Sequence, residues 1–267
     1  MQIELSLEKS IEENAAEYFE KAKKAKKKLV GLQKAILETR EKIQELERTP
    51  IQEKTRLVKK RKRQWFEVFH WFFSSDEFLV VGGRNAKSNE AIVKKHLEEG
   101  DLFLHADVHG GSACIIKAFG REIPLQDMRE AAVFAGAFSS AWKQGTASVD
   151  VYAVQSNQVS KAPPTGESLG KGAFIISGKR EWFRKIALGF FVGVEKENSQ
   201  YIVISGPEQA IKKHSIAMIK IVQGSLEKSN AAKQILSALE KRVGGKIPIH
   251  LDEIVSMLPG PGIRVLE

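Results

Sequence analysis

The chain has 267 residues, enough for one to three domains, and its 42% hydrophobic and 28% charged residues are typical of a globular protein. Its 42 Lys and Arg against 33 Asp and Glu give a net charge of +9, which favours a polyanionic partner. Cys114 is the single cysteine, which excludes an internal disulfide and a thiolate metal cluster. Because the sequence has no long apolar span and no signal-peptide pattern, we expect a cytoplasmic protein without a membrane partner.

Most of the positive charge lies at the start of the chain, in an arm that we assign to residues 1–64. These residues carry 18 Lys and Arg against 11 Asp and Glu, a net of +7 out of +9. From Ile11 to Leu46, apolar residues recur at alternating spacings of four and three, a heptad pattern that predicts a coiled coil. Pro50 is expected to end the first helix, and residues 51–63 to form a basic returning helix. The arm is therefore predicted to be a long antiparallel coiled-coil hairpin.

A compact mixed module is expected to follow over residues 65–195. Seven of the chain's 21 aromatic residues fall within residues 65–78, which predicts that the chain enters a hydrophobic core there, and Cys114 is expected to be a buried strand residue. The patterns predict strands at 77–81, 102–107, 113–119, 148–155, 173–177 and 188–194, and helices at 86–97 and 128–142. Strands 102–107 and 113–119 are expected to pair as a hairpin. Between 156 and 171 we expect a long loop, a feature that is usually functional or mobile.

A small α/β unit is expected over residues 196–267. Strands are predicted at 201–205 and 217–222, and helices at 208–214, 226–243 and 252–258. The predicted fold class is therefore α/β, in the α+β sense, with the coiled-coil hairpin followed by the module and this appendage.

Two runs of cations in the arm are candidates for contact with phosphates. One run spans residues 21–28 in the first helix, and the other consists of Lys59, Lys60, Arg61, Lys62 and Arg63. A charge run is often only a solvated helix face, but two such runs favour nucleic-acid binding. Binding through them should weaken steeply with salt, because each neutralised phosphate releases counterions.

His105, Asp107 and His109 alternate along a predicted strand, so their side chains share one face if the strand continues that far. Two imidazoles and a carboxylate could hold a metal ion. No further ligand stands nearby, however, and Gly110-Gly111 is expected to end the strand. Hydrogen bonding to a backbone or to a phosphate-bearing ligand is favoured, with an inert structural pair as the alternative.

Three turns combine glycine with a hydrogen-bond donor, at residues 82–85, 110–112 and 178–180. Glycine lets the backbone approach a phosphate, and Arg84, Lys179 and Arg180 supply donors beside two of these turns. None of the turns matches a Walker or dinucleotide-binding pattern, and no Gly-x-Ser-x-Gly elbow is present. We therefore expect no catalytic residue, no cofactor and no small-molecule substrate.

Several separated strings, taken together, resemble the RNA-binding module and coiled-coil middle region of the NFACT family. They are residues 13–23 (ENAAEYFEKAK), 65–76 (WFEVFHWFFSSD), 81–86 (VGGRNA), 104–110 (LHADVHG) and 158–163 (QVSKAP). The family includes nuclear export mediator factor and the bacterial fibronectin-binding-protein-A-like proteins, and the strings are most similar to archaeal and eukaryotic forms. The resemblance covers residues 5–195.

This resemblance implies a role in ribosome-associated quality control, with the large ribosomal subunit and tRNA or rRNA as partners. Carried over position by position, it assigns six residues to a ligand-facing surface: Arg84, Asn89, His105, Asp107, His109 and Lys161. Lys171, Lys179 and Arg180 join them from the chemistry of their side chains alone. The family's amino-terminal domain and helix-hairpin-helix region have no counterpart in this sequence, so a fragment or a short variant that does not extend peptides by itself is expected.

Two other interpretations of the sequence stay open. One is an interaction scaffold whose coiled coil pairs with another protein chain, or a DNA-binding variant of the same module. The other is a metal-dependent enzyme centred on His105, Asp107 and His109.

Overall fold

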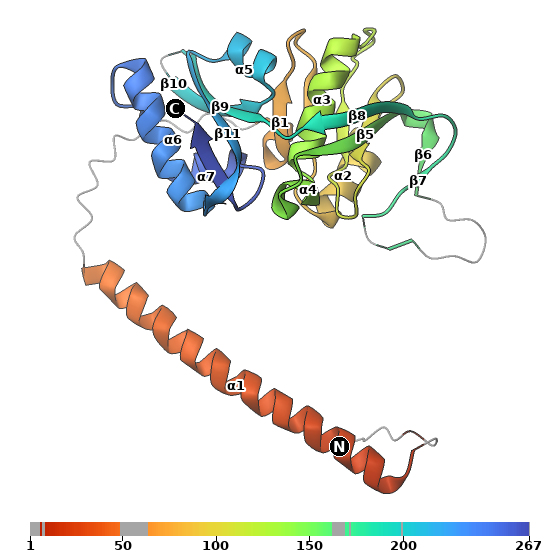
Figure 1. The fold of residues 1–267 in the computed structure, drawn as a ribbon, viewed down its shortest axis with the longest axis vertical. Helices are drawn as coiled ribbons and strands as arrows, with labels where there is room; N and C mark the ends of the chain where they lie inside the picture. Colours follow the sequence, from red (N-terminus) through yellow and green to blue (C-terminus); the bar gives the residue numbers. More distant parts are fainter. Residues whose placement is uncertain are drawn as a thin grey trace. The chain divides into compact units, whose positions relative to one another are not determined.

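The computed structural model describes residues 6, 9–48, 64–161, 169–170, 172–198 and 200–266 (Figure 1). The chain divides into two units, Met1–Arg61 and Lys62–Glu267. None of the described helices is long and apolar enough to cross a membrane.

The first unit contains one long helix, α1 (Ile11–Arg48). It begins with a reciprocal cap, in which Ser10 Oγ accepts from the Glu13 N–H at 3.2 Å and Glu13 Oε2 accepts from the Ser10 N–H at 2.8 Å. Three apolar residues of the predicted seam are exposed: Leu29 (60%), Leu32 (63%) and Ile36 (49%). The predicted helix is confirmed, whereas residues 51–63 lie outside the described part, so the hairpin stays a prediction.

The second unit is built on a six-stranded sheet in the order β1-β2-β4-β3-β5-β8, and all of its pairings are antiparallel. Its strands are β1 (His70–Phe73), β2 (Leu79–Gly82), β4 (Cys114–Ile116), β3 (Leu102–Ala106), β5 (Ser148–Gln155) and β8 (Glu181–Ala187). A short 3-10 turn, η1 (Trp65–Val68), precedes β1, and η2 (Ser156–Gln158) follows β5. The α+β class, the hairpin of β3 with β4, and the buried strand position of Cys114 are confirmed.

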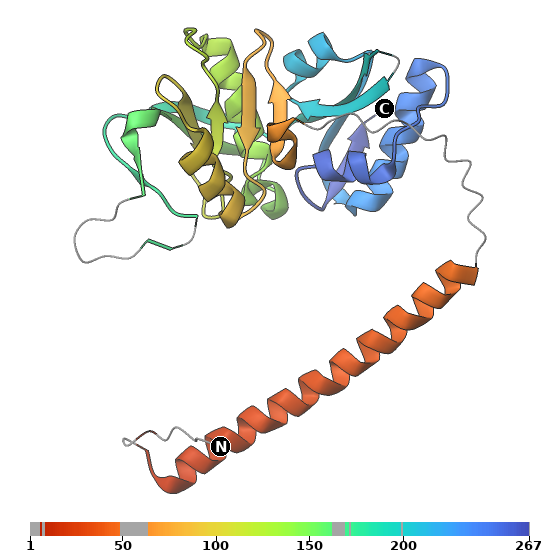
Figure 2. The same ribbon diagram turned by 180° about the vertical axis from the view of Figure 1, so that it is seen from behind.

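The two faces of this sheet pack against different helices, as the opposite views of Figures 1 and 2 show. Neighbouring residues of one strand point to opposite faces, so Val80 packs in the core under α3 (Leu125–Ala137) and Val81 packs in the core under α2 (Ala86–His96). The aromatic run at 65–78 divides in the same way, with Phe72 in the first core and Trp71 in the second.

The helix predicted at 128–142 is two helices, α3 and α4 (Ser140–Gln144). Ser139 interrupts the run with φ −95° and ψ 172°, and its Oγ accepts from the Ala141 N–H at 3.2 Å. A serine in extended geometry with this bond is an N-cap, so the apolar stripe continues across a break that periodicity alone does not show.

A second, four-stranded antiparallel sheet has the order β10-β9-β11-β12. Its elements, with their covering helices, are β9 (Phe190–Glu197), β10 (Gln200–Gly206), α5 (Glu208–His214), β11 (Ala217–Leu226), α6 (Lys228–Val243), α7 (Leu251–Met257) and β12 (Ile263–Leu266). Residue 195, the expected end of the module, falls inside β9. The core under α3 continues into this sheet, because Phe134 and Phe190 belong to one buried cluster.

Candidate nucleic-acid interface

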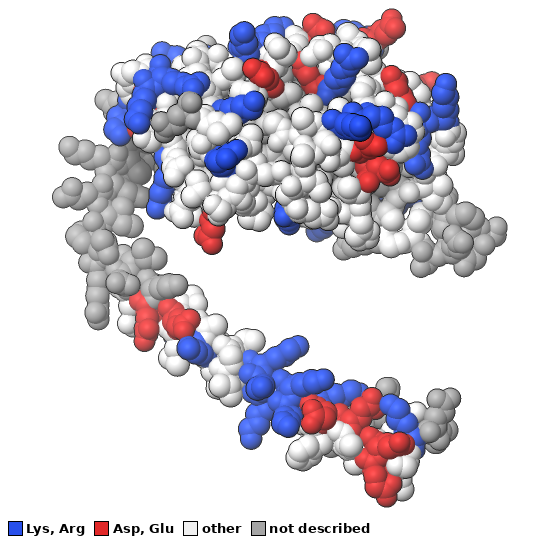
Figure 3. Space-filling model, in the orientation of Figure 1, with Lys and Arg blue, Asp and Glu red and all other residues white. Residues whose placement is uncertain are grey.

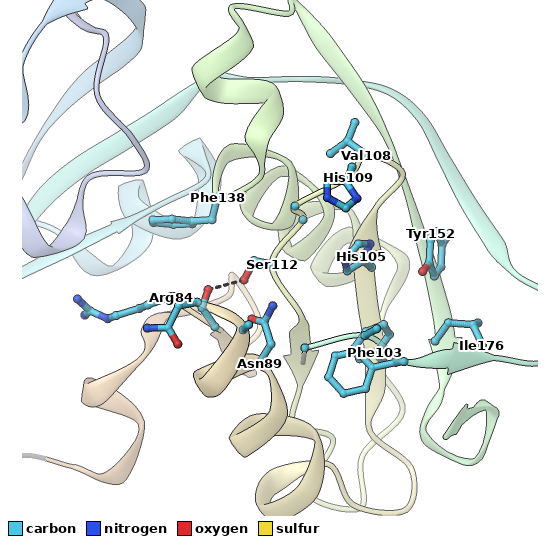
Figure 4. Close-up of a pocket in the computed structure, with 18 residues that line it drawn as sticks. Arg84, Asn89, Phe103, His105, Val108, His109, Ser112, Phe138, Tyr152 and Ile176 are labelled. Atoms are coloured by element: carbon cyan, nitrogen blue, oxygen red, sulfur yellow. Dashed lines mark hydrogen bonds between the residues drawn. The ribbon is translucent and has the colours of Figure 1, made fainter. Parts of the chain in front are cut away.

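A pocket of about 470 Å³ opens on the α2 face of the six-stranded sheet (Figure 4). Three segments enclose it: the β2–α2 turn, the loop between β3 and β4, and the hairpin of β6 (Val159–Ser160) with β7 (Ile175–Ile176). Its lining side chains include Arg84, Asn85, Asn89, Phe103, His105, Val108, His109, Ser112, Phe138, Tyr152, Phe174 and Ile176.

One wall of the pocket is fixed by a close approach between the β2–α2 turn and α2. Asn85 caps α2, with its Oδ1 accepting from the Ser88 N–H at 3.0 Å. The buried Asn89 Oδ1 accepts from the Ala113 N–H at 3.3 Å, and Ser112 Oγ donates to the Gly83 carbonyl at 2.7 Å. These bonds tie the turn and the β3–β4 loop to one helix end, so the wall is preformed.

Aromatic rings form the floor. Phe103 and His105 stand two residues apart on β3, so they share a face, and their rings are parallel within 8° with centroids 6.3 Å apart. His105 pairs in register with Tyr152 on β5, whose ring centroid is 5.9 Å away. Phe103 and Tyr152 are buried, at 1% and 8% exposed, so their rings form the base of the pocket. RNA-binding sheets stack unpaired bases on aromatic residues that lie on neighbouring strands.

Burial lowers the pKa of His105 below its usual value, although hydrogen bonds to the backbone at Ala106 and Gly111 and the charge of Asp107 act in the opposite direction. The imidazole is therefore neutral at pH 7. It sits tightly against Gly111, where a Cβ would lie 2.7 Å from His105 Cε1. A neutral, fixed imidazole can stack on a base and offer one donor and one acceptor.

The β6–β7 hairpin is fastened to α2 at the edge of the pocket. Lys161 forms an ion pair with Glu90 of α2, and the Gly172 N–H donates to Glu90 Oε1 at 3.0 Å. The hydrogen bond from Lys161 lowers the pKa of Glu90. Lys161 also lies 6.0 Å from the centroid of Phe174, a lining residue. Lys161 thus acts on the pocket by holding this hairpin.

Cations surround the aromatic floor rather than filling it. The Arg180 guanidinium lies 4.6 Å from the Tyr152 ring centroid, a cation–π contact. Arg84 lines the pocket, but its side chain extends away from His105 and Tyr152, and its Nη2 donates to the Phe69 carbonyl at 2.9 Å (Figure 4). No carboxylate occurs among the lining residues that the structure describes. The pocket therefore suits a ligand that combines flat rings with negative charge.

The structure brings four of the predicted site residues into this pocket: Arg84, Asn89, His105 and His109. Arg180 and Lys161 contact lining residues, and Lys179 is exposed, with its carbonyl accepting from Gln158 Nε2 at 3.0 Å. Asp107 is exposed just beyond β3, next to the pocket loop. Lys59, Lys60, Arg61, Lys62, Arg63 and Lys171 lie outside the described residues. Within the described part, no group of three or more His, Cys, Asp and Glu side chains is arranged to hold a metal ion.

The aromatic floor is not among the features predicted from the sequence. Phe103 and Tyr152 have the pattern of ordinary core residues in apolar strands, and only the register of β3 against β5 joins them to His105. Interleaving of aromatic and basic residues at 174–182 is the one signal in the sequence that points to this surface.

An aromatic floor on an antiparallel sheet, bordered by cations, makes this pocket a candidate nucleic-acid-binding surface. Residues 68–178, which include every lining residue of this pocket, match the family model for the NFACT protein RNA binding domain. The archaeal Rqc2 homolog aRqcH of Methanocaldococcus jannaschii is 32% identical over 221 residues, which are 83% of this chain and 32% of that protein. The human ribosome quality control complex subunit NEMF is 38% identical over 174 residues, 63% of this chain and 16% of that protein.

The chain belongs to the NFACT family and is of the archaeal type. It spans about a third of the archaeal relative and about a sixth of the human one. Among solved structures, the C-terminal part of the fibronectin/fibrinogen-binding protein from Streptococcus suis covers 78% of this chain and 81% of that chain. Its 21% identity and TM-score of 0.40 are too low to support an argument.

Proposed function

We propose that this chain is an RNA-binding component of ribosome-associated quality control that binds the large ribosomal subunit, tRNA or both. The observation that carries the proposal is the pocket within the NFACT module, which the rings of Phe103, His105 and Tyr152 line and which has no lining carboxylate among the described residues. Relatives named as ribosome quality control complex subunits support the same setting, and the cytoplasmic location is part of the proposal. We propose a binding role and not a catalytic one.

The lysines of α1 support a second point of contact. Figure 3 shows a gathering of blue side chains on one stretch of α1, and the helix carries six lysines over residues 21–28. Of these, Lys23 lies 3.8 Å from Glu20 and Lys21 lies over the Tyr18 ring, both at exposed positions. Exposed lysines act as point charges on phosphates, so α1 would add affinity without sequence preference.

The exposed seam of α1 supports a coiled-coil partner as a second element of the function. Leu29, Leu32 and Ile36 are about half exposed or more, which is costly for a helix that has no covering partner. That partner is either the returning segment of the same arm or another protein chain. Sedimentation equilibrium of the chain, alone and with Leu32→Asp, distinguishes these: a dimer that the substitution dissociates indicates a second chain.

The proposal is tested by measuring the affinity of the full chain for tRNA and for a short single-stranded RNA. Tyr152→Leu keeps an apolar side chain but removes the ring, and the loss of stacking on one base predicts weaker binding by about 5- to 150-fold. Tyr201→Leu is the matched control, because Lys196 lies over the Tyr201 ring at 5.7 Å outside the pocket. Equal affinities of both variants and the parent would contradict the role of the pocket.

A further inference from the structure

Arg84 and Phe138 line one side of the pocket, and the Phe138 ring stacks on His70, which lies outside the lining. His70 and Phe138 have centroids 3.8 Å apart and planes within 23°. Arg84 Nη2 is bound to the carbonyl of Phe69, the residue before His70, so the guanidinium is held beside this pair. The side chain of Arg84 therefore extends out of the pocket, toward the elements that follow the pocket residues in the chain.

Two lysines from different elements approach the loop between α7 and β12. Lys228, the first residue of α6, donates from Nζ to the Leu258 carbonyl at 2.7 Å. Two residues further along, a Cβ on Gly260 would lie 3.6 Å from Lys143 Cγ of α4. The position of α4 is fixed by Gln223 of β11, whose Nε2 donates to the Thr146 carbonyl at 2.9 Å.

Arg84, Lys143 and Lys228 form a cationic patch. Within the described part of the chain, neither Lys143 nor Lys228 has a carboxylate within ion-pair distance. Burial lowers the pKa of the half-buried Lys228, and the charges of Arg84 and Lys143 lower it further. Mutual repulsion among these charges is unfavourable for folding, and an anion bound at the patch reduces it.

The pKa of the neighbouring His70 imidazole is affected by charges of the same patch. Burial lowers the pKa of His70 well below its usual value, and Arg84 and Lys228 act in the same direction. Its Nδ1 is buried and has no hydrogen-bond partner among the described residues. The His70 ring, which stacks on Phe138, therefore lies near the charges of both Arg84 and Lys228.

We propose that an RNA strand leaving the pocket passes its phosphates over Arg84, Lys143 and Lys228, so that the C-terminal sheet and α6 extend the RNA site beyond residues 68–178. The inference rests on the proposed function, because the ligand in the pocket is the same strand. Lysine ammonium groups contact phosphate oxygens as point charges and read no base, so this extension adds affinity and register rather than sequence preference.

The test compares two double variants of the full chain that remove the same charge. Lys143→Gln/Lys228→Gln alters the patch, and the glutamine at 228 keeps a donor near the Leu258 carbonyl. Lys212→Gln/Lys241→Gln alters exposed lysines of α5 and α6, with position 241 about 20 Å along the helix from position 228. Affinity for a single-stranded RNA is measured over a range of salt concentrations for both.

The patch variant is expected to reduce the slope of log affinity against log salt by about 1.4, which corresponds to two lost phosphate contacts, while the control leaves it unchanged. Equal slopes in the two variants would overturn the inference. If the patch variant melts earlier than the parent, Lys143→Gln alone serves instead, because its side chain is exposed, and a slope reduction of about 0.7 is then expected. An unchanged slope with Lys143→Gln overturns the inference equally.

Failure of this inference is distinguishable from failure of the proposed function. If Tyr152→Leu weakens RNA binding and the patch variant does not, the pocket binds RNA and the extension is wrong. If the parent chain binds no RNA, both are wrong.

Discussion

Gly83 approaches Asn89 so closely that a Cβ on Gly83 would lie 1.9 Å from Asn89 Oδ1 and 2.9 Å from the Asn89 backbone nitrogen. This contact sets the position of the β2–α2 turn, and with it the wall of the pocket. Because the obstacle includes backbone, a side chain at this position cannot be accommodated by a rotamer change.

Gly83→Ala is therefore expected to lower the free energy of unfolding by about 1–3 kcal/mol, the usual cost of overpacking, and to weaken RNA binding. Gly245→Ala is the control, since a Cβ there meets nothing within 4 Å. Chemical denaturation measures the first effect. A Gly83→Ala protein as stable as the control would show that the turn can move away from α2.

Lys117 forms a buried ion pair with Asp101 at 2.5 Å, and both side chains are at most 3% exposed. Lys117→Met leaves the carboxylate buried without its counter-charge, so a loss of about 3–5 kcal/mol in the free energy of unfolding is expected. Asp101→Asn/Lys117→Met should recover part of that loss. Lys246→Met breaks a pair in which the lysine is 93% exposed, and is expected to cost less than about 1 kcal/mol.

His70 makes stability depend on pH. Its pKa in the folded chain lies well below the ordinary value of 6.5, so the unfolded chain takes up a proton first as the pH falls below 6.5. Stability should therefore be lost progressively on acidification below that value and be unaffected above it. His70→Phe keeps a ring against Phe138 and should flatten the decrease, as measured by denaturation on either side of the ordinary pKa. The same decrease in both proteins would assign the effect to other groups.

The cations of the arm should control how RNA binding responds to salt. Neutralising Lys59, Lys60, Arg61, Lys62 and Arg63 to glutamine is expected to weaken binding and to reduce the salt slope by up to about 3.5. The same substitutions at five lysines within residues 21–28 provide a parallel measurement on α1. Full retention of affinity and slope after the first change would remove residues 59–63 from the RNA contact.

Regular elements with one buried face are predictable from the sequence. The helix expected at 208–214 has the bounds of α5, because Ala210 and Ile211 pack inward while the lysines stay outside. The strand β8 is not predicted by the pattern. Its partner β5 has a register shift between Val149 and Val151, and Lys185 of β8 has φ +53°, so the alternation of buried and exposed residues is broken there.

The strand β1 is also not predicted by the pattern, for a different reason. Trp71 and Phe72 are both buried, one in each core. The aromatic residues of β1 therefore show no alternation of apolar and polar side chains, although they form a strand. The residues of the pocket likewise divide into those that the sequence predicts and those that it does not. The family strings predict His105, Arg84 and Asn89, whereas Tyr152 joins the pocket only through strand register, a long-range feature that local patterns do not contain.

Cosedimentation with large ribosomal subunits that hold a peptidyl-tRNA tests the central claim most directly. The parent chain should pellet with these subunits at low salt and be released as salt rises, and Tyr152→Leu should be released at lower salt than Tyr201→Leu. A parent chain that stays in the supernatant at low salt, or that pellets identically with both substitutions, would contradict the account.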